Sequence, residues 1–356
     1  MTGQRLRQVW IIARLQLSRV FFSKRSFWVY LLAIFPAVIF FGHGISVQIR
    51  RARFATVAKP TPVLEAIRPG DTADDVLARA GRPMSDFTFR RNPRGRDDGP
   101  EMRRMSYTDG HRVWDLFFES GILQSANSRT LIDLQEDRRV FATVFQHFYL
   151  RGAIFFGCLG IFMNLFRGEM LDKTLHFWFL APVRREVLLA GKYLAGLIAA
   201  TLIFTVGAVI AYGGLLWGQE PSQTSALWRD YGATQILWYV ASAALACVGY
   251  GSVFLAAGML LRNPIIPAVV ILIWEGSNPV LPAMLQKLSV LYYAQSLAPV
   301  PPLADPYAPA LIRLLMSPAE PPSAIAAVAG LLALTAVVLW LAARSVRRLE
   351  VNYGTD

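Results

Sequence analysis

Long apolar runs separated by short polar stretches dominate the pattern of this chain. A helix that crosses a bilayer needs about 20 mainly apolar residues. The pattern predicts six spans, at residues 26–45, 148–166, 193–217, 236–261, 265–275 and 324–343. The predicted fold class is therefore an α-helical polytopic membrane protein with six transmembrane helices.

The fifth predicted span, residues 265–275, is too short to cross a bilayer as a helix. Residues 276–322, which follow it, are rich in proline and are predicted to form a broken or re-entrant outer region packed against protein. Ionisable groups within apolar runs are costly, so Glu275, with Asn278 nearby, is the candidate for a substrate pathway. The alternative is that Glu275 caps a helix end close to water.

The first 25 residues combine an apolar stripe with a basic face. Leu6, Trp10 and Leu17 follow helical spacing, while Arg7 and Arg14 lie on another face. This pattern is typical of an amphipathic helix lying in the headgroup region, and we predict such a cytoplasmic helix over residues 1–25. The alternative is a basic flank that orients the first span.

Charge is sparse and its position indicates topology. The chain has 17% charged and 54% hydrophobic residues and a formal net charge of +12. Its Lys and Arg residues lie mainly at the ends of apolar runs, so we expect a membrane partner and no nucleic acid. Short loops rich in Lys and Arg stay in the cytoplasm, which predicts two cytoplasmic termini and an extracytoplasmic stretch at residues 46–147.

Residues 46–147 carry the pattern of a small α+β domain. Asp71 or Thr72 is the expected N-cap of a short helix that contains Val76 and ends at Gly81. Aromatic and apolar clusters separated by turn signals follow, which predicts a small antiparallel sheet.

Catalytic and metal-binding patterns are missing from the sequence. Gly191-Lys192 resembles the end of a phosphate-binding loop, but the rest of that motif is missing. Glu186 stands where the motif has its first glycine, and Tyr193 stands where it has Ser or Thr. The four histidines lack metal-ligand spacing, and both cysteines fall inside apolar runs. We predict no catalytic residue, no metal site and no cofactor bound by this chain.

The segment at residues 167–192, between the second and third spans, resembles a known family. It contains an acidic residue, a Lys-Thr-Leu triplet, an apolar cluster, a proline and a basic residue, followed by paired aliphatic residues and Gly-Lys. These are Glu169, Lys173, Thr174, Leu175, Phe177, Trp178, Phe179, Leu180, Pro182, Arg185, Val187, Leu188, Gly191 and Lys192. The pattern resembles the membrane subunit of an ABC-2 type exporter, although Ala181 stands where that family often has Ser or Thr.

The resemblance implies a function. Two permease copies, expected as a homodimer, would combine with two separate ABC ATPase subunits that bind ATP and Mg²⁺. The segment at 167–192 would be the coupling helix that docks into the ATPase. The outer aromatic residues Trp274, Tyr292 and Tyr293 favour a lipid-like or amphipathic substrate.

The extracytoplasmic stretch carries a second resemblance. Gly70, Thr72, Val76, Gly81, Pro83, Tyr107, Gly110 and Leu116 to Gly121 resemble the small domain of the outer-membrane assembly factor BamE. The resemblance implies a periplasmic location, an envelope partner for this domain and a bacterial inner membrane for the chain.

Two alternatives of other classes stay open. In the first, the chain is an envelope-assembly scaffold that acts through its periplasmic domain. In the second, it is a membrane-embedded enzyme that modifies lipids. Co-purification of an ATPase would favour the exporter over the scaffold. The lipid-modifying enzyme would require a cluster of ionisable residues.

Overall fold

The computed structural model describes residues 2–23, 26–90, 100–131, 133–171, 178, 180, 183–261, 265–278, 281–299 and 322–347. The chain forms two compact units, which are described separately. The helical unit comprises residues 1–40, 138–216 and 224–356, and the sheet unit comprises residues 41–137 and 217–223.

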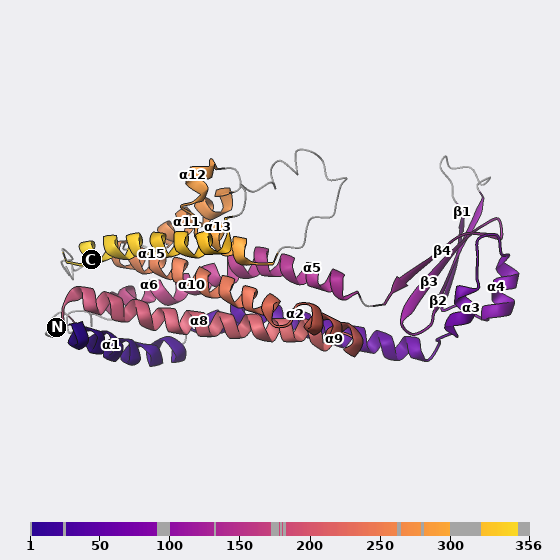
Figure 1. The fold of residues 1–356 in the computed structure, drawn as a ribbon, viewed down its shortest axis with the longest axis horizontal. Coiled ribbons are helices and arrows are strands. Elements are labelled where there is room, and N and C mark those ends of the chain that lie inside the picture. Colours follow the sequence, from indigo (N-terminus) through magenta and orange to yellow (C-terminus); the bar gives the residue numbers. More distant parts are fainter. Residues whose placement is uncertain are drawn as a thin grey trace. The chain divides into compact units, whose positions relative to one another are not determined.

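Long apolar helices build the helical unit (Figure 1). They are α1 (Thr2–Phe22), most of α2 (Ser26–Ala55), the end of α5 (Leu134–Val144), η1 (Phe145–Ile154), α6 (Phe155–Leu171), α8 (Arg185–Trp217), α10 (Thr234–Leu260) and α15 (Ala324–Val346). Within the described residues, five helices are long and apolar enough to cross a membrane, at Ser26–Ala55, Leu134–Met170, Arg185–Trp217, Thr234–Leu260 and Ala324–Val346. These helices indicate a membrane-embedded protein, and the expected number of six spans stays a prediction.

Helix α6 packs along α10, and α10 also packs against α15. Glycines allow the close approach: a Cβ at Gly251 of α10 would lie 2.5 Å from the ring of Phe162. A Cβ at Gly258 would lie 2.7 Å from the backbone of Met163. Small residues at such contacts let helix backbones come together where lipid offers no hydrophobic driving force.

The second predicted span, residues 148–166, is part of a longer continuous helix. Helix α5 begins at Leu134 and passes through the π-helical η1 into α6, which ends at Leu171. The sheet unit ends at residue 137, within this helix, and not at the predicted residue 147. Aromatic side chains surround the π segment: the rings of Phe145 and Tyr239 lie 4.7 Å apart, and the Tyr149 hydroxyl donates to the Phe204 carbonyl over 2.6 Å.

Other predicted ends also shift. Helix α2 continues to Ala55, past the predicted end of the first span at residue 45, with Pro36 inside it. Helix α8 begins at Arg185 and not at residue 193, so the Gly-Lys pair lies in its first turns. The stretch between the predicted spans 193–217 and 236–261 contains α9 (Pro221–Asp230). Hydropathy marks the apolar part of a helix, whereas the helix itself continues through polar residues.

The predicted fifth span, residues 265–275, is the short helix α11 (Ile265–Ser277). The described residues between 276 and 299 also form the short helices α12 (Ala283–Gln286) and α13 (Val290–Leu297). The broken character of this region agrees with the prediction up to residue 299, while residues 300–321 lie outside the described part.

The sheet unit contains the predicted short helix and small antiparallel sheet. Its elements are α3 (Thr61–Glu65), α4 (Ala73–Ala80), β1 (Ser85–Arg90), β2 (Glu101–Thr108), β3 (Arg112–Glu119) and β4 (Ile122–Thr130). The strands lie in the order β1-β2-β3-β4 and are antiparallel. Gly110, with φ +91°, turns β2 into β3, and Gly121, with φ +82°, turns β3 into β4.

Helices α3 and α4 and one face of the sheet enclose a single apolar core. Its buried side chains are Leu64, Ile67, Ala73, Val76, Ala80, Met105, Tyr107, Leu116, Phe118 and Leu123. Thr72, one of the two predicted N-caps, accepts a hydrogen bond from the Asp75 N–H at the start of α4. The Tyr107 hydroxyl donates to the Gly81 carbonyl over 3.0 Å, which ties β2 to the end of α4.

Candidate functional site

The junction of α1, α6 and α8 contains the described part of the predicted coupling segment. Glu169, Trp178, Leu180 and Arg185 belong to it. The other predicted coupling residues lie outside the described residues; they are Lys173, Thr174, Leu175, Phe177, Phe179 and Pro182.

A buried ion pair joins α6 to α8 in this junction. The Lys192 ammonium lies 2.7 Å from the Glu169 carboxylate, and it also donates to the Leu165 carbonyl and lies 4.7 Å from the centre of the Phe166 ring. Lys192 is fully buried and Glu169 is only 6% exposed. An ammonium without a partner would be costly in such surroundings, so the pair fixes the first turns of α8 to the last turns of α6.

Helix α1 contributes two further groups to the same carboxylate. Gln16 donates to Glu169 over 2.7 Å, and the Arg19 guanidinium lies 3.7 Å from it. A Cβ at Gly191 of α8 would lie 2.7 Å from Ile12, so glycine at this position permits the close packing of α1 against α8. Glu169 thus connects three helices.

Next to the ion pair lies a small apolar cluster. Buried Ile12, Val187 and Leu188 form its centre, and Trp178 packs against them together with Val9 and Val183. Leu180 points away from this cluster, since 80% of it is exposed. In the described part of the segment between α6 and α8, Trp178 and Val183 are therefore anchored and Leu180 is exposed.

The start of α8 is also joined to the end of α15. Arg185 donates to the Arg347 carbonyl over 3.1 Å and to the Val346 carbonyl over 3.4 Å. Glu186 forms an ion pair with Arg347. Arg185, predicted as a coupling residue, thus contacts the end of the last helix.

Sequence reasoning did not predict the roles of Gln16, Arg19 and Lys192. Lys192 was interpreted only as part of the Gly-Lys motif and as the end of a false phosphate loop. Its place inside an otherwise apolar helix was the available signal, because an ionisable group in such a run requires a partner. The positions of Gln16 and Arg19 become informative only once α1 is packed against α6.

The second predicted site lies where α11 meets α13. The Glu275 carboxylate accepts hydrogen bonds from the N–H groups of Val290 at 3.0 Å and Leu291 at 3.2 Å. It also accepts from the Ser289 hydroxyl. Glu275 is only 5% exposed and caps the N-terminus of α13; the capping alternative expected such a cap close to water, whereas here it is buried. Asn278 donates to the Gln286 carbonyl over 3.2 Å and stabilises the same turn region.

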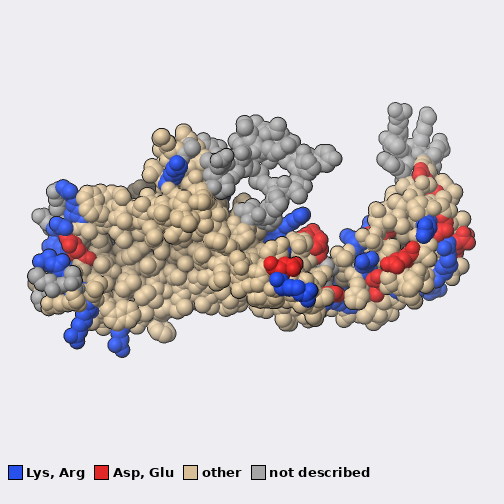
Figure 2. All heavy atoms as spheres, in the orientation of Figure 1, with Lys and Arg blue, Asp and Glu red and all other residues tan. Residues whose placement is uncertain are grey.

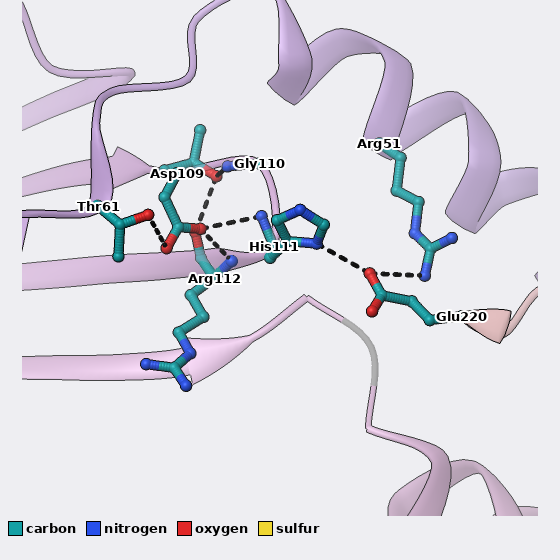
Figure 3. A network of polar contacts seen from close by, with 8 residues as sticks. Arg51, Thr61, Asp109, Gly110, His111, Arg112 and Glu220 are labelled. Carbon is teal, nitrogen blue, oxygen red and sulfur yellow. Dashed lines mark hydrogen bonds and ion pairs between the residues drawn. The ribbon is translucent and has the colours of Figure 1, made fainter. Parts of the chain in front are cut away.

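A third polar site lies within the sheet unit, at the turn between β2 and β3 (Figure 3). Asp109 accepts from the N–H groups of His111 at 2.9 Å and Arg112 at 2.6 Å. The His111 ring nitrogen lies 2.9 Å from Glu220, and Arg51 lies 3.5 Å from the same carboxylate. The network joins this turn to the end of α2 and to the residue before α9.

These residues line a cavity of about 210 Å³ in the sheet unit. Burial raises the pKa of Asp109, but hydrogen bonds from Arg112, His111 and Thr61 outweigh it, so that the pKa is lowered overall. Glu220 is occupied by Arg51 and His111, and Asp109 by backbone N–H groups, so these contacts fit a structural role better than a catalytic one.

The described residues hold no cluster suited to a metal ion. No group of three or more His, Cys, Asp and Glu side chains converges among them. Outside the junction in Figure 3, His43 lies 3.3 Å from Asp137 and His147 contacts the Thr143 carbonyl. Cys158 and Cys247 are buried and free.

Acid is expected to loosen the sheet unit before pH reaches about 3. Hydrogen bonding to Arg103 lowers the pKa of Asp86, and hydrogen bonding to Arg79 and the Arg68 N–H lowers that of Asp71. An aspartate in the unfolded chain titrates near pKa 3.9, so these groups contribute stability above about pH 4, and it is lost as the pH falls through their lower folded pKa values.

Hydrogen exchange of the full chain, corrected for intrinsic exchange rates, measures this effect in β2 and β3. We expect protection that is constant above about pH 5 and falls below about pH 4. Replacing Asp86 with asparagine should flatten the decline. Unchanged protection down to pH 3 would contradict the expected role of these carboxylates.

Comparisons of the chain with protein families, curated proteins and solved structures found no match.

Proposed function

We propose that this chain is the membrane subunit of an ATP-driven exporter of the ABC-2 type. The observation that carries the proposal is the anchored segment between α6 and α8. Trp178 packs onto α1 and α8, while Leu180 stays 80% exposed. An exposed leucine on a segment fixed at its base is suited to dock into an apolar groove of a partner.

The polar contacts around Glu169 support a mechanical role. The carboxylate joins α6 to α8 through Lys192 and contacts α1 through Gln16. A displacement of the docked segment would therefore move α6 and α8 together instead of bending one of them. In this mechanism ATP-driven closure of the ATPase pair shifts both helices and repacks two permease copies, expected as a homodimer.

The missing phosphate loop makes a separate motor necessary in this proposal. ATP and Mg²⁺ would bind the partner ATPase, and this chain would bind no cofactor and catalyse no reaction. Glu275 and Asn278, proposed earlier as a substrate pathway, are occupied in contacts with α13 and its preceding turn. The substrate class proposed from the outer aromatic residues is lipid-like or amphipathic.

The proposed topology places both termini in the cytoplasm of a bacterial cell and the sheet unit in the periplasm. Figure 2 supports it in part, since Lys and Arg gather at the end of the helical unit that contains the start of α1, next to a wide band with few charged side chains. The BamE-like character of the sheet unit, with an envelope partner, belongs to the same proposal.

Stimulation of the partner ATPase tests the docking. We expect the double variant Trp178→Ala and Phe179→Ala to abolish export-linked stimulation without preventing membrane insertion. Leu180→Asp should weaken ATPase binding at least about tenfold, because a carboxylate would be buried without a partner at a cost above about 1.4 kcal/mol.

Ile122→Asp is the matched control, since Ile122 is 48% exposed and lies in the sheet unit. It should leave stimulation unchanged. Normal stimulation by the double variant and by Leu180→Asp would refute the assignment. If no ATPase co-purifies at all, the envelope scaffold becomes the better assignment.

A further inference from the structure

An apolar groove lies between α1, α8 and α15 in the helical unit. Its volume is about 430 Å³, and its lining consists of Val9, Glu186, Leu189, Ala190, Tyr193, Leu194, Leu339, Trp340 and Ala343. These residues come from the end of the unit where α1 begins and α15 ends (Figure 1). The junction around Glu169 does not contribute to it.

The polar groups of the lining are engaged elsewhere. Glu186 is paired with Arg347, and the Tyr193 hydroxyl donates to the Val248 carbonyl over 2.9 Å. The remaining lining atoms offer water no adequate hydrogen bonds, and a water molecule in a cavity needs two to four polar partners. The groove therefore fits hydrocarbon.

A cation lies next to the lining residue Trp340. The Arg344 guanidinium lies 5.8 Å from the centre of the Trp340 ring, and within the described residues no carboxylate forms an ion pair with it. Arg185 and Arg347 lie close by but are held by carbonyl groups and by Glu186. Trp340 itself is 59% exposed, as expected for an aromatic residue at the membrane–water interface.

We propose that this groove binds one acyl chain of an anionic phospholipid, whose headgroup contacts Arg344. An apolar groove with a neighbouring cation that no described carboxylate pairs matches a phospholipid, in which a charged headgroup adjoins the acyl chains. Basic residues beside a span attract anionic lipids, and each such charge raises the affinity for the lipid about fivefold.

Native mass spectrometry of the purified full chain tests the proposal, with phosphatidylglycerol and phosphatidylcholine of equal chain length as probes. We expect phosphatidylglycerol to bind about fivefold more tightly. Ala190→Phe, which fills the groove, should remove the tightly bound lipid. Leu341→Phe is the matched control, because Leu341 is exposed on α15 but does not line the groove.

A second pair of variants tests the headgroup contact. Arg344→Gln should bring the two affinities together, whereas Arg7→Gln, which removes the same charge from α1, should preserve the preference. Equal binding of both lipids by the unaltered chain would overturn the proposal. Unchanged lipid binding by Ala190→Phe would also overturn the proposal. This holds even if that variant alters the dimerisation of the chain, because the groove would then contact a second copy and not a lipid.

Discussion

Replacing Glu169 with glutamine should destabilise the protein more than replacing Lys192 with methionine. Lys192 is fully buried, and within the described part of the chain Glu169 is its one carboxylate partner, so Glu169→Gln removes that counter-charge from a buried ammonium. Lys192→Met removes the ammonium, and Glu169 keeps Gln16 and Arg19. Breaking a buried pair from one side costs about 3–5 kcal/mol.

Unfolding in mixed detergent micelles measures the difference. We expect a loss of about 3 kcal/mol or more for Glu169→Gln and a clearly smaller loss for Lys192→Met. Because an apolar replacement of a whole ion pair is often nearly neutral, the double variant should be more stable than Glu169→Gln alone. Equal losses for the two single variants, or additive losses in the double variant, would show that the pair does not hold α6 to α8.

Replacing Glu275 with alanine should also destabilise the protein strongly. Its carboxylate accepts from the Val290 and Leu291 N–H groups and from the Ser289 hydroxyl. Each buried donor left without an acceptor costs about 1–3 kcal/mol, so the total loss should reach at least about 3 kcal/mol. The lost attraction between a carboxylate and the N-terminus of α13 adds to it.

Graded variants separate this capping role from a role in a substrate pathway. Ser289→Ala should cost about 1 kcal/mol, as the loss of a helix cap does, and Glu275→Gln should fall between Ser289→Ala and Glu275→Ala. The free energy of unfolding and the export rate are measured on the same preparations. Loss of export in Glu275→Gln with unchanged stability would contradict the capping role and favour the pathway.

The sequence predicts the membrane helices better than their ends. Apolar runs locate α8 and α10, because hydrocarbon depth sets the length of such runs. Arg185 at the start of α8 and Ala55 at the end of α2 lie beyond these runs, in polar stretches that form helix equally well. The π-helical η1 has no signal in the sequence, since it depends on how Phe145 and Tyr149 pack against other helices.

The sheet unit was predictable from local patterns. Thr72 and Gly81 bound α4 as expected, because N-cap and C-cap chemistry is local. Glu275 is predicted to line a substrate pathway, with the capping of a helix end close to water as the alternative, and its hydrogen bonds to the start of α13 come from residues that the sequence pattern does not connect with it. The contact between Glu169 and Lys192 was not predicted, because their separation in the chain gives no indication that α6 and α8 meet at these residues.

Site-specific photocrosslinking at position 180, in membranes that contain the native partners, tests the central claim most directly. A photoreactive residue in place of Leu180 should form an adduct with an ATPase subunit, and the yield should change when ATP is bound. The same residue at position 284, where Met284 is 85% exposed on α12, is the control and should form no such adduct. An adduct with an ATPase from position 180 alone supports the docking, whereas no ATPase adduct from position 180 would contradict it.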